Sequence, residues 1–316
     1  MQDVQDHFSI KPFKKEHVPE LRSLFLSEPE DTRILNCGFI YDTLQYARLL
    51  PPVNRIVAYH AHDKKPIGFV ALEEITKKLF SLQFLFVNPK YRNLGVGKRL
   101  VEAAISFAKE KNASKINLAI YPSKISTIEL YKRYGFRIIG KTSLVQGFLP
   151  GFSAFNVSKR VILRRNGLKM EPFKNVFSNS SLDSFAEKQQ IFEIFKSCMS
   201  QDWINFFEVN HRNLKHGSRN IWLPHFVKAL VSKDNNSFAL LFNQPYPPID
   251  VVELFIKPDI SVRPLFESLL SILSNRGIGL TKLWLFGLTD ELPNEWLKKK
   301  QMEKYEFLCM GKSLAE

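Results

Sequence analysis

The sequence predicts an α/β (α+β) protein built from two tandem units, each a mixed central sheet flanked by helices. Three observations support this. The chain of 316 residues is longer than a usual single domain. Strand-like apolar runs alternate with stretches whose apolar residues recur at helical spacing. Segments of the first half also return in the second half in the same order, which indicates an internal duplication.

The duplication is visible in three matches. Two segments recur with small changes: IKPFK at 10–14 as MEPFK at 170–174, and YGFRIIGK at 134–141 as YEFLCMGK at 305–312. Between them, each half holds an apolar run that ends at a proline, Pro89 or Pro258. The distance from Pro89 to Phe136 is 47 residues and that from Pro258 to Phe307 is 49. We therefore expect one domain at 1–166 and a second at 167–316.

The first half contains the elements of an α/β unit in order. Apolar and β-branched runs predict strands at 9–13, 55–61, 67–73, 79–87, 115–120, 136–140 and 153–163. Helical spacing predicts helices at 18–25, 34–47, 100–108 and 125–134. The polar segment 164–167 is the expected linker.

The second half follows the same order with weaker patterns. We expect helices at 183–198, 265–273 and 295–302, and strands at 238–242, 251–256 and 283–286. Trp203, Phe206, Phe207 and Trp222 are expected to lie in its core or to line an acceptor site.

A short loop with two glycines joins the strand at 79–87 to the following helix. The first amides of a helix have no partner within the helix, and the helix dipole favours negative charge there, so this turn predicts an anion site. Gly95 and Gly97 would let the main chain approach phosphate oxygens closely. A Walker A loop would need glycine in place of Arg92, and a dinucleotide fingerprint would need glycine in place of Leu100.

The loop reads R-x-x-G-x-G from Arg92 to Gly97, and the later segment Leu130–Phe136 reads L-Y-x-x-x-G-F. With both motifs in register, the chain over residues 9–143 resembles the GNAT superfamily of acyl-CoA N-acyltransferases. The resemblance implies acetyl-CoA, or another acyl-CoA, as co-substrate. It also implies a primary amine acceptor, carried by a small molecule or a peptide, that attacks the acyl group directly in a ternary complex.

The resemblance also assigns roles to residues. The coenzyme would contact the end of the strand, the loop, and the start of a later helix, namely Leu85, Phe86, Val87, Arg92, Asn93, Leu94, Gly95, Val96, Gly97, Lys98, Lys124 and Tyr131. Many members of the family have Asn where this chain has Lys124. Tyr131 would donate a proton to the leaving thiolate; alternatively it packs beside Ile128 and Tyr134.

The attacking amine must lose a proton, so a general base or a chain of waters is needed. Many family members place Glu on the strand before the loop, where this chain has Gln83, which does not titrate. Gln83 could hold a water instead, and Glu73 or Glu74 could act as the base. At the end of their strand, however, these two carboxylates are expected to be exposed charges.

The second half lacks the motif. Counting from Pro258, the loop positions become Ser261, Pro264 and Phe266, and Tyr131 becomes Met302. Proline removes an amide donor and phenylalanine blocks a close approach. We expect a structural partner that forms an internal pseudo-dimer with the first half and helps to wall the acceptor site.

Composition narrows the function classes. The N-terminus has no signal peptide pattern and no apolar run reaches a membrane span, so we expect a cytoplasmic protein, monomeric or homodimeric. The 3 cysteines form no metal or disulfide motif, and His60 with His62 has no third ligand, so no metal is expected. The net charge of +14 favours anionic ligands. Two other functions remain open: a non-catalytic acyl-CoA-binding or sensing protein, and an enzyme that acts on nucleic acid.

Overall fold

The computed structural model describes two compact units. The described residues are 8–13, 19–21, 53–148, 177–180, 185–208, 226–232, 237–244, 249–256, 280–286, 294–299 and 302–314. Unit 1 consists of Met1–Ile138 with Met310–Glu316, and unit 2 of Ile139–Cys309. The predicted linker at 164–167, the helices at 34–47 and 265–273 and the strand at 153–163 lie outside the described residues.

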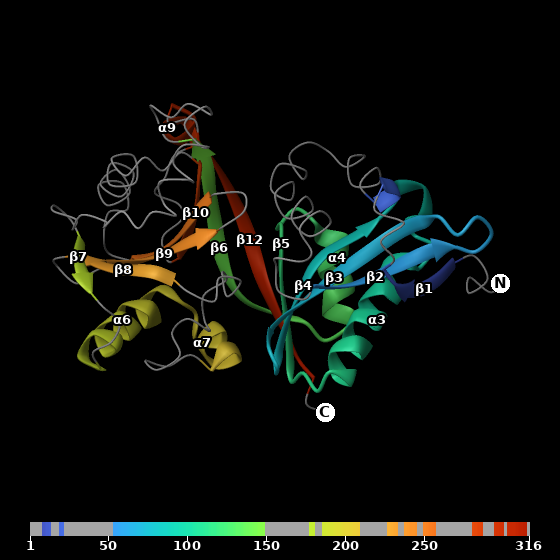
Figure 1. The fold of residues 1–316 in the computed structure, drawn as a ribbon, viewed down its shortest axis with the longest axis horizontal. Coiled ribbons are helices and arrows are strands. Elements are labelled where there is room, and N and C mark those ends of the chain that lie inside the picture. Colours follow the sequence, from blue (N-terminus) through green and yellow to red (C-terminus); the bar gives the residue numbers. More distant parts are fainter. Residues whose placement is uncertain are drawn as a thin grey trace, which may run out of the picture. The chain divides into compact units, whose positions relative to one another are not determined.

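Unit 1 is built on a mixed sheet. Its strands are β1 (Phe8–Pro12), β2 (Val53–His60), β3 (Pro66–Thr76), β4 (Leu79–Val87) and β5 (Lys115–Ile120). They lie in sequence order, with β1 to β4 antiparallel and β5 parallel to β4 (Figure 1). The mixed sheet that the sequence predicts is confirmed.

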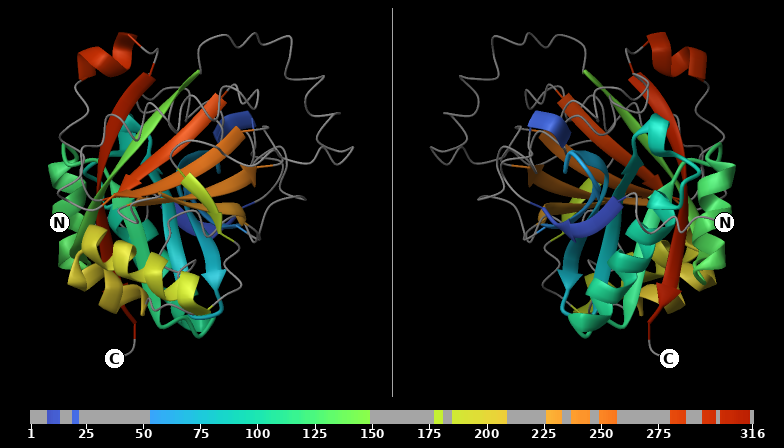
Figure 2. Two further views of the ribbon diagram at one scale, coloured as in Figure 1. Left: turned by 90° about the vertical axis from the view of Figure 1, so that its left-hand side faces the viewer. Right: turned by 90° about the vertical axis from the view of Figure 1, so that its right-hand side faces the viewer.

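One face of this sheet is covered by α3 (Val96–Glu110), which packs against β2, β3 and β4 (Figure 2). The helix buries apolar residues at helical spacing, namely Val96, Leu100, Val101, Ala104 and Ala108. Gly68 on β3 faces this helix: a Cβ there would lie 2.7 Å from the Phe86 carbonyl oxygen and 3.3 Å from Leu100 Cδ1. Any side chain at Gly68 would push the helix or the neighbouring strand away.

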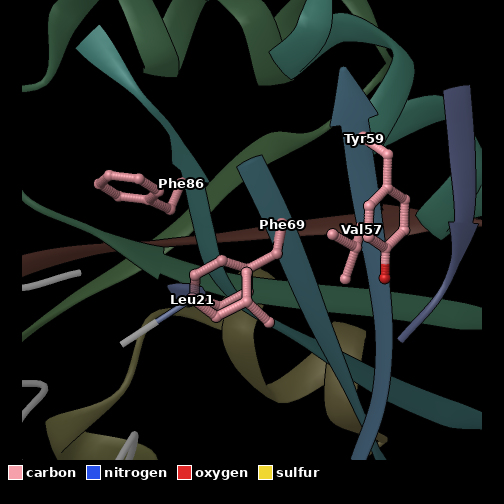
Figure 3. Packing of buried hydrophobic residues seen from close by; sticks show 5 residues of the cluster. All are labelled: Leu21, Val57, Tyr59, Phe69 and Phe86. Carbon is pink, nitrogen blue, oxygen red and sulfur yellow. The ribbon is translucent and has the colours of Figure 1, made fainter. Parts of the chain in front are cut away.

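The other face of the sheet carries an apolar cluster. It consists of Leu21, Val57, Tyr59, Phe69 and Phe86 (Figure 3). Cross-strand pairing explains how it forms, because Val57 lies opposite Phe69 and Phe69 opposite Phe86, and residues paired in a ladder point to the same face. A second helix, α4 (Ile125–Arg133), follows β5 and buries Ile128 and Tyr131.

Unit 2 has the same strand order. Its strands are β6 (Arg137–Phe148), β7 (Phe177–Ser180), β8 (Phe226–Ser232), β9 (Ser237–Gln244), β10 (Ile249–Ile256) and β11 (Leu280–Phe286). They run β7-β8-β9-β10-β11-β6, and only β10 and β11 are parallel. Its helices are α6 (Phe185–Cys198), which packs on β9 and β10, α7 (Gln201–Phe207) and α9 (Asn294–Lys299).

Strands β6 (Arg137–Phe148) and β12 (Met302–Ser313) each cross the boundary between the two units. β6 continues from unit 1 and pairs with β11 of unit 2. The last strand, β12 (Met302–Ser313), lies next to β5 in the strand order, and its final residues from Met310 belong to unit 1. The predicted helix at 295–302 is therefore too long: α9 ends at Lys299, and Met302 begins a strand.

Aromatic residues of unit 2 pack in its core. Trp203 and Phe207 are buried, and their ring centroids lie 4.7 Å apart. Trp203 lies over Gly140, where a Cβ would come within 3.1 Å of its ring. The core role is thus confirmed for Trp203 and Phe207, whereas Trp222 lies outside the described residues.

Candidate active site

The turn between β4 and α3 is held by its own backbone. After β4, a short 3₁₀ helix, η3 (Pro89–Tyr91), is capped by Asn88, whose side chain accepts from the Lys90 amide at 3.0 Å. Asn93 (φ 64°) and Gly95 (φ 80°) then adopt left-handed backbone conformations, which reverse the chain into the helix. Asparagine and glycine are the residues that reach this region at least cost.

The N-terminus of α3 points its free amides out of this turn. No side chain caps the helix at Gly95, and its first turn contains no acidic residue. The first backbone bond within the helix is donated by Arg99 to the Gly95 carbonyl at 3.0 Å. The amides before Arg99 have no acceptor within the helix, and the dipole adds partial positive charge, so the turn is suited to an anion.

Arg92 ties this turn to the end of the strand. Its Nε donates to the Val87 carbonyl oxygen at 3.0 Å, and the residue is exposed to solvent. This hydrogen bond fixes the stem of the side chain beside the turn. A guanidinium held there adds a full positive charge to the partial charge of the helix end.

Strands β4 and β5 are paired only over their first residues. Their parallel register runs from Leu79 with Lys115 to Leu82 with Leu118. Just past this point, Phe84 has a positive φ of 44°, and the register between β3 and β4 shifts between Phe69 and Ala71. This bulge bends β4, and in the described residues the β5-facing edge of β4 is unpaired from Gln83 onward.

Gly97 leaves space at the first turn of α3. A Cβ built on it would meet only Val87 Cγ2 at 3.6 Å and Leu130 Cδ2 at 3.9 Å, which are ordinary contacts. The fold itself therefore does not require glycine here. A ligand that approaches the backbone closely would, because a side chain would displace it.

Tyr131 lies on α4, one residue after Leu130. The side chain is buried, and its ring meets the edge of the Phe136 ring with centroids 5.4 Å apart. Burial raises the pKa of the phenol above its ordinary value, because the charged phenolate would lose its hydration. The phenol therefore stays protonated at neutral pH and can donate a hydrogen bond or a proton.

The arrangement of β4, the turn and α3 lies within a stretch of sequence that matches a known protein family. Residues 16–136 match the sequence model of the family described as Acetyltransferase (GNAT) family. Residues 16–136 are thus similar in sequence to the GNAT acetyltransferase family. The match includes the whole of the turn between β4 and α3, and it ends at Phe136, against which Tyr131 packs.

Individual proteins resemble the chain over different lengths. An uncharacterized N-acetyltransferase from Methanocaldococcus jannaschii is 33% identical over 91 residues, which cover 27% of this chain and 39% of that protein. A GCN5-related N-acetyltransferase structure from Sphaerobacter thermophilus covers 98% of this chain and 96% of its own, with a TM-score of 0.56 and 12% identity. A GNAT-family acetyltransferase from Staphylococcus aureus covers 42% and 85%, with a TM-score of 0.35 and 24% identity. The Sphaerobacter likeness shows the mixed α/β GNAT fold.

Glu73 on β3 differs from its expected position. The side chain is only 1% exposed, so the prediction of an exposed strand-end charge is wrong for this residue. The reason is that β3 continues to Thr76, which places Glu73 inside the sheet, between Val53 on β2 and Ser81 on β4. Burial raises the pKa of the carboxyl well above its ordinary value.

Gln83 lies just beyond the last paired residues of β4 and β5. Its Nε2 donates to Ser81 Oγ at 2.8 Å, and the side chain is half-buried. Gln83 thus links the open end of the strands to the buried Ser81 hydroxyl. Ser81 and its neighbour Asn117 were not predicted as site residues, although each is a polar residue within an apolar strand.

The structure also describes other residues that were predicted to bind the coenzyme. Lys124 is the exposed N-cap of α4, and its side chain makes no capping hydrogen bond. Leu94 is exposed on the turn, Lys98 is exposed in the first turn of α3, and Leu85 is half-buried on β4. The positions that correspond to the loop in the second half, Ser261, Pro264 and Phe266, lie outside the described residues.

Two classes of feature are absent from the described part of the chain. No helix there is both long and apolar enough to cross a membrane. No group of three or more His, Cys, Asp or Glu side chains in those same ranges is placed to hold a metal ion.

Proposed function

We propose that this chain is an acyl-CoA-dependent N-acyltransferase that moves an acetyl group from acetyl-CoA to a primary amine. The observation that carries the proposal is the uncapped N-terminus of α3, which follows directly from the unpaired end of β4. The first feature suits a diphosphate, and the second offers main-chain groups to an amide-containing arm. The GNAT match over residues 16–136 supports both assignments.

The coenzyme would use the residues predicted for it. Amides from Asn93 to Lys98 would hold the diphosphate, with Arg92 beside them. The pantetheine arm would run along Leu85–Val87, where β4 has separated from β5. When bound, acetyl-CoA supplies a thioester whose carbonyl carbon is open to attack by an amine.

Tyr131 would assist the departure of the sulfur. Its phenol carries a proton at neutral pH because burial opposes ionisation. From α4 it would donate a hydrogen bond, or the proton itself, to the departing thiolate. The amine nitrogen forms the new bond to the acyl carbon as the bond from carbon to sulfur breaks, and the surplus proton of the amine must pass to a base.

Glu73 is the described carboxylate best suited to take the earlier proton, which the ammonium form of the acceptor must lose before its nitrogen can attack. Gln83 occupies the position where many GNAT members carry a base and it does not titrate, but it donates to Ser81, which lies opposite Glu73. A carboxyl with a raised pKa is a better proton acceptor near neutral pH than an ordinary one.

For the second half of the sequence, we propose a structural role without a coenzyme. The strand order of unit 2 matches that of unit 1, as expected for a duplicated fold. Met302, the counterpart of Tyr131, lies on a strand instead of a helix, and its side chain has no phenol. Domains at 1–166 and 167–316 remain our proposed evolutionary division, which differs from the division into compact units because β6 and β12 each cross the boundary between the units.

One experiment tests the coenzyme site. Thermal unfolding is measured with acetyl-CoA and with pantetheine, which lacks the diphosphate. Acetyl-CoA at about a hundred times its Kd should stabilise the fold by roughly 2.7 kcal/mol, and pantetheine should do far less. Equal shifts with both ligands, or none with either, would contradict the proposed diphosphate site.

A second candidate is a protein that binds acyl-CoA without turnover. It is favoured by Gln83, which leaves the usual base position without a titratable group. Release of free thiol from acetyl-CoA with butylamine, spermidine and a short peptide separates the two. Coenzyme binding without thiol release from any of these amines would favour the sensor.

A further inference from the structure

A row of polar side chains crosses the sheet of unit 1 at its centre. Glu73 on β3 is paired with Ser81 on β4, and Ser81 is paired with Asn117 on β5. Residues paired directly across strands point to the same face, so these three side chains stand side by side, with about 4.8 Å between strands. We call Glu73, Ser81 and Asn117 the polar row.

The polar row lies on the face opposite α3. Along β3, Glu73 alternates in step with Phe69, which belongs to the apolar cluster of that face. Leu72, one residue earlier, points the other way. Glu73 and Ser81 are nevertheless buried, so they are not hydrated as surface residues would be.

Two oxygens of the row lack a hydrogen-bond donor. Glu73 Oε2 and Asn117 Oδ1 are both buried, and among the described residues neither has a partner. Ser81 lies between them, and its Oγ already accepts from Gln83 Nε2 at 2.8 Å. Buried acceptors without donors are costly, so the row is suited to a ligand that brings several N–H groups.

The row opens toward the separation of β4 and β5. One step further along the same face come Gln83, which is half-buried, and Ala119, which is exposed. These two residues lie just beyond Leu82 and Leu118, the last pair of the parallel register. A group that enters between the strands would meet Gln83 first and then the buried oxygens of the row.

From these positions we propose that the polar row is the binding site for the amino group of the acceptor, with Glu73 and Asn117 accepting its hydrogens. The inference rests on the proposed acyl transfer. It narrows the acceptor substrate to amines whose amino group is at the end of an unbranched, narrow chain that can reach the row. An ammonium group offers three donors, which match the two free acceptors and leave one for the Ser81 hydroxyl.

Proton balance follows from the same geometry. A solution ammonium carries one proton more than the attacking amine. Glu73 releases its own proton to solvent as the ammonium binds and, as a carboxylate, takes one proton from it, which leaves R–NH₂ and Glu73–COOH. The proton that the nitrogen loses on forming the amide replaces the one that Tyr131 gives to the thiolate. Two cationic residues share this face near the row: Arg55 on β2, paired with Ala71, and Lys115 on β5, two residues before Asn117. Both would assist ionisation of Glu73 rather than oppose it.

Infrared difference spectroscopy on the full chain tests binding without turnover. The carbonyl band of a protonated carboxyl is assigned to Glu73 by its loss in Glu73→Gln. At a pH where the band is present, butylammonium chloride should diminish it, because the ion pair converts the carboxyl to carboxylate. Tetramethylammonium chloride, a cation without N–H groups, should leave it in place. An unchanged band with butylammonium up to the highest concentration that the fold tolerates would overturn the inference.

Kinetics give the second readout. With butylamine as acceptor, Glu73→Gln and Asn117→Leu should raise the KM for amine about tenfold or more and leave the KM for acetyl-CoA unchanged. Glu74→Gln is the control, since Glu74 is the next residue on β3 and points to the other face. In the wild type, kcat/KM for the amine should level off at a pH below the amine's own pKa of about 10.4, whereas in Glu73→Gln it should rise up to that pKa.

The two proposals fail in different ways. If acetyl-CoA gives no thermal stabilisation, the proposed acyl transfer is contradicted. The infrared result alone then decides whether the row binds amines. If acetyl-CoA stabilises but Glu73→Gln and Asn117→Leu behave like Glu74→Gln, the coenzyme site stands and the row is not the acceptor site.

Discussion

Burial of the Glu73 side chain makes the stability of the fold depend on pH. Its folded-state pKa lies above the ordinary value near 4.3, so the folded state holds this proton more firmly than the unfolded chain does. Stability from this group is complete below about pH 4.3 and is lost as the pH rises toward the folded pKa, at roughly 1.4 kcal/mol per pH unit. Glu73→Gln, which cannot ionise, should escape the loss.

Thermal unfolding at about pH 4 and about pH 8 checks this expectation. The difference in Tm between Glu73→Gln and wild type should grow in favour of the variant as the pH rises. Glu74→Gln should show no such growth, because Glu74 is only partly buried. A constant difference for Glu73→Gln at both pH values would mean that the carboxyl is already ionised in the fold.

The Tyr131 phenol can be removed with little change to packing. In Tyr131→Phe the ring still meets the edge of Phe136, so the fold and the stabilisation by acetyl-CoA should persist. Loss of the proton donor should lower kcat by about 10²–10⁴, the usual contribution of a general acid. Tyr134→Phe is a matched control on the same segment: it loses a 2.7 Å hydrogen bond to Glu102 and should keep its kcat.

The burial of Glu73 could not be predicted from the position of the residue in the sequence. Glu73 was expected at an exposed strand end, but its pairing with Val53 and Ser81 places it inside the sheet. The pairing is set by strands that lie far away along the chain, and a single sequence does not contain that information. The loop residues were easier, since a turn between a strand and a helix is fixed locally.

At the scale of elements, the two glycines of the turn should respond differently to alanine. Gly95 has φ 80°, so Gly95→Ala should cost about 1–2 kcal/mol of stability. Gly97 is helical and has room for a Cβ, so Gly97→Ala should be neutral or should stabilise α3 by up to about 1 kcal/mol. Both should weaken acetyl-CoA binding.

Unfolding curves with and without acetyl-CoA separate these effects. Gly97→Ala should keep its Tm without ligand and lose most of the shift with ligand. Ser106→Ala, at an exposed position of the same helix, should keep both. If Gly97→Ala retained the full ligand shift, close approach of a diphosphate to this backbone would be excluded.

The elements themselves were predictable to different degrees. β4 and β5 have the predicted bounds, because their apolar runs end at clear breakers, Pro89 and Pro122. Strand β6 is longer than the predicted 136–140, and β12 begins where a helix was expected. Both are stabilised by pairing with strands distant in sequence, and lysines and glutamates near Met302 favour a helix locally.

At the scale of the whole molecule, the last residues of β12 belong to unit 1, although the rest of the strand belongs to unit 2. Met310 and Leu314 are buried, and the Leu314 amide donates to the Ser114 carbonyl oxygen at 2.7 Å, within unit 1. Deletion of residues 310–316 should therefore destabilise unit 1, by about 1.5–3 kcal/mol for each of these two side chains. Deletion of 315–316 alone, which spares both, should leave the stability unchanged. Thermal unfolding in the presence of acetyl-CoA reports on unit 1 specifically, since the proposed site lies there. The longer deletion should lower the Tm of the transition that the ligand shifts, and an unchanged transition would mean that residues 1–138 complete the domain without the C-terminal strand.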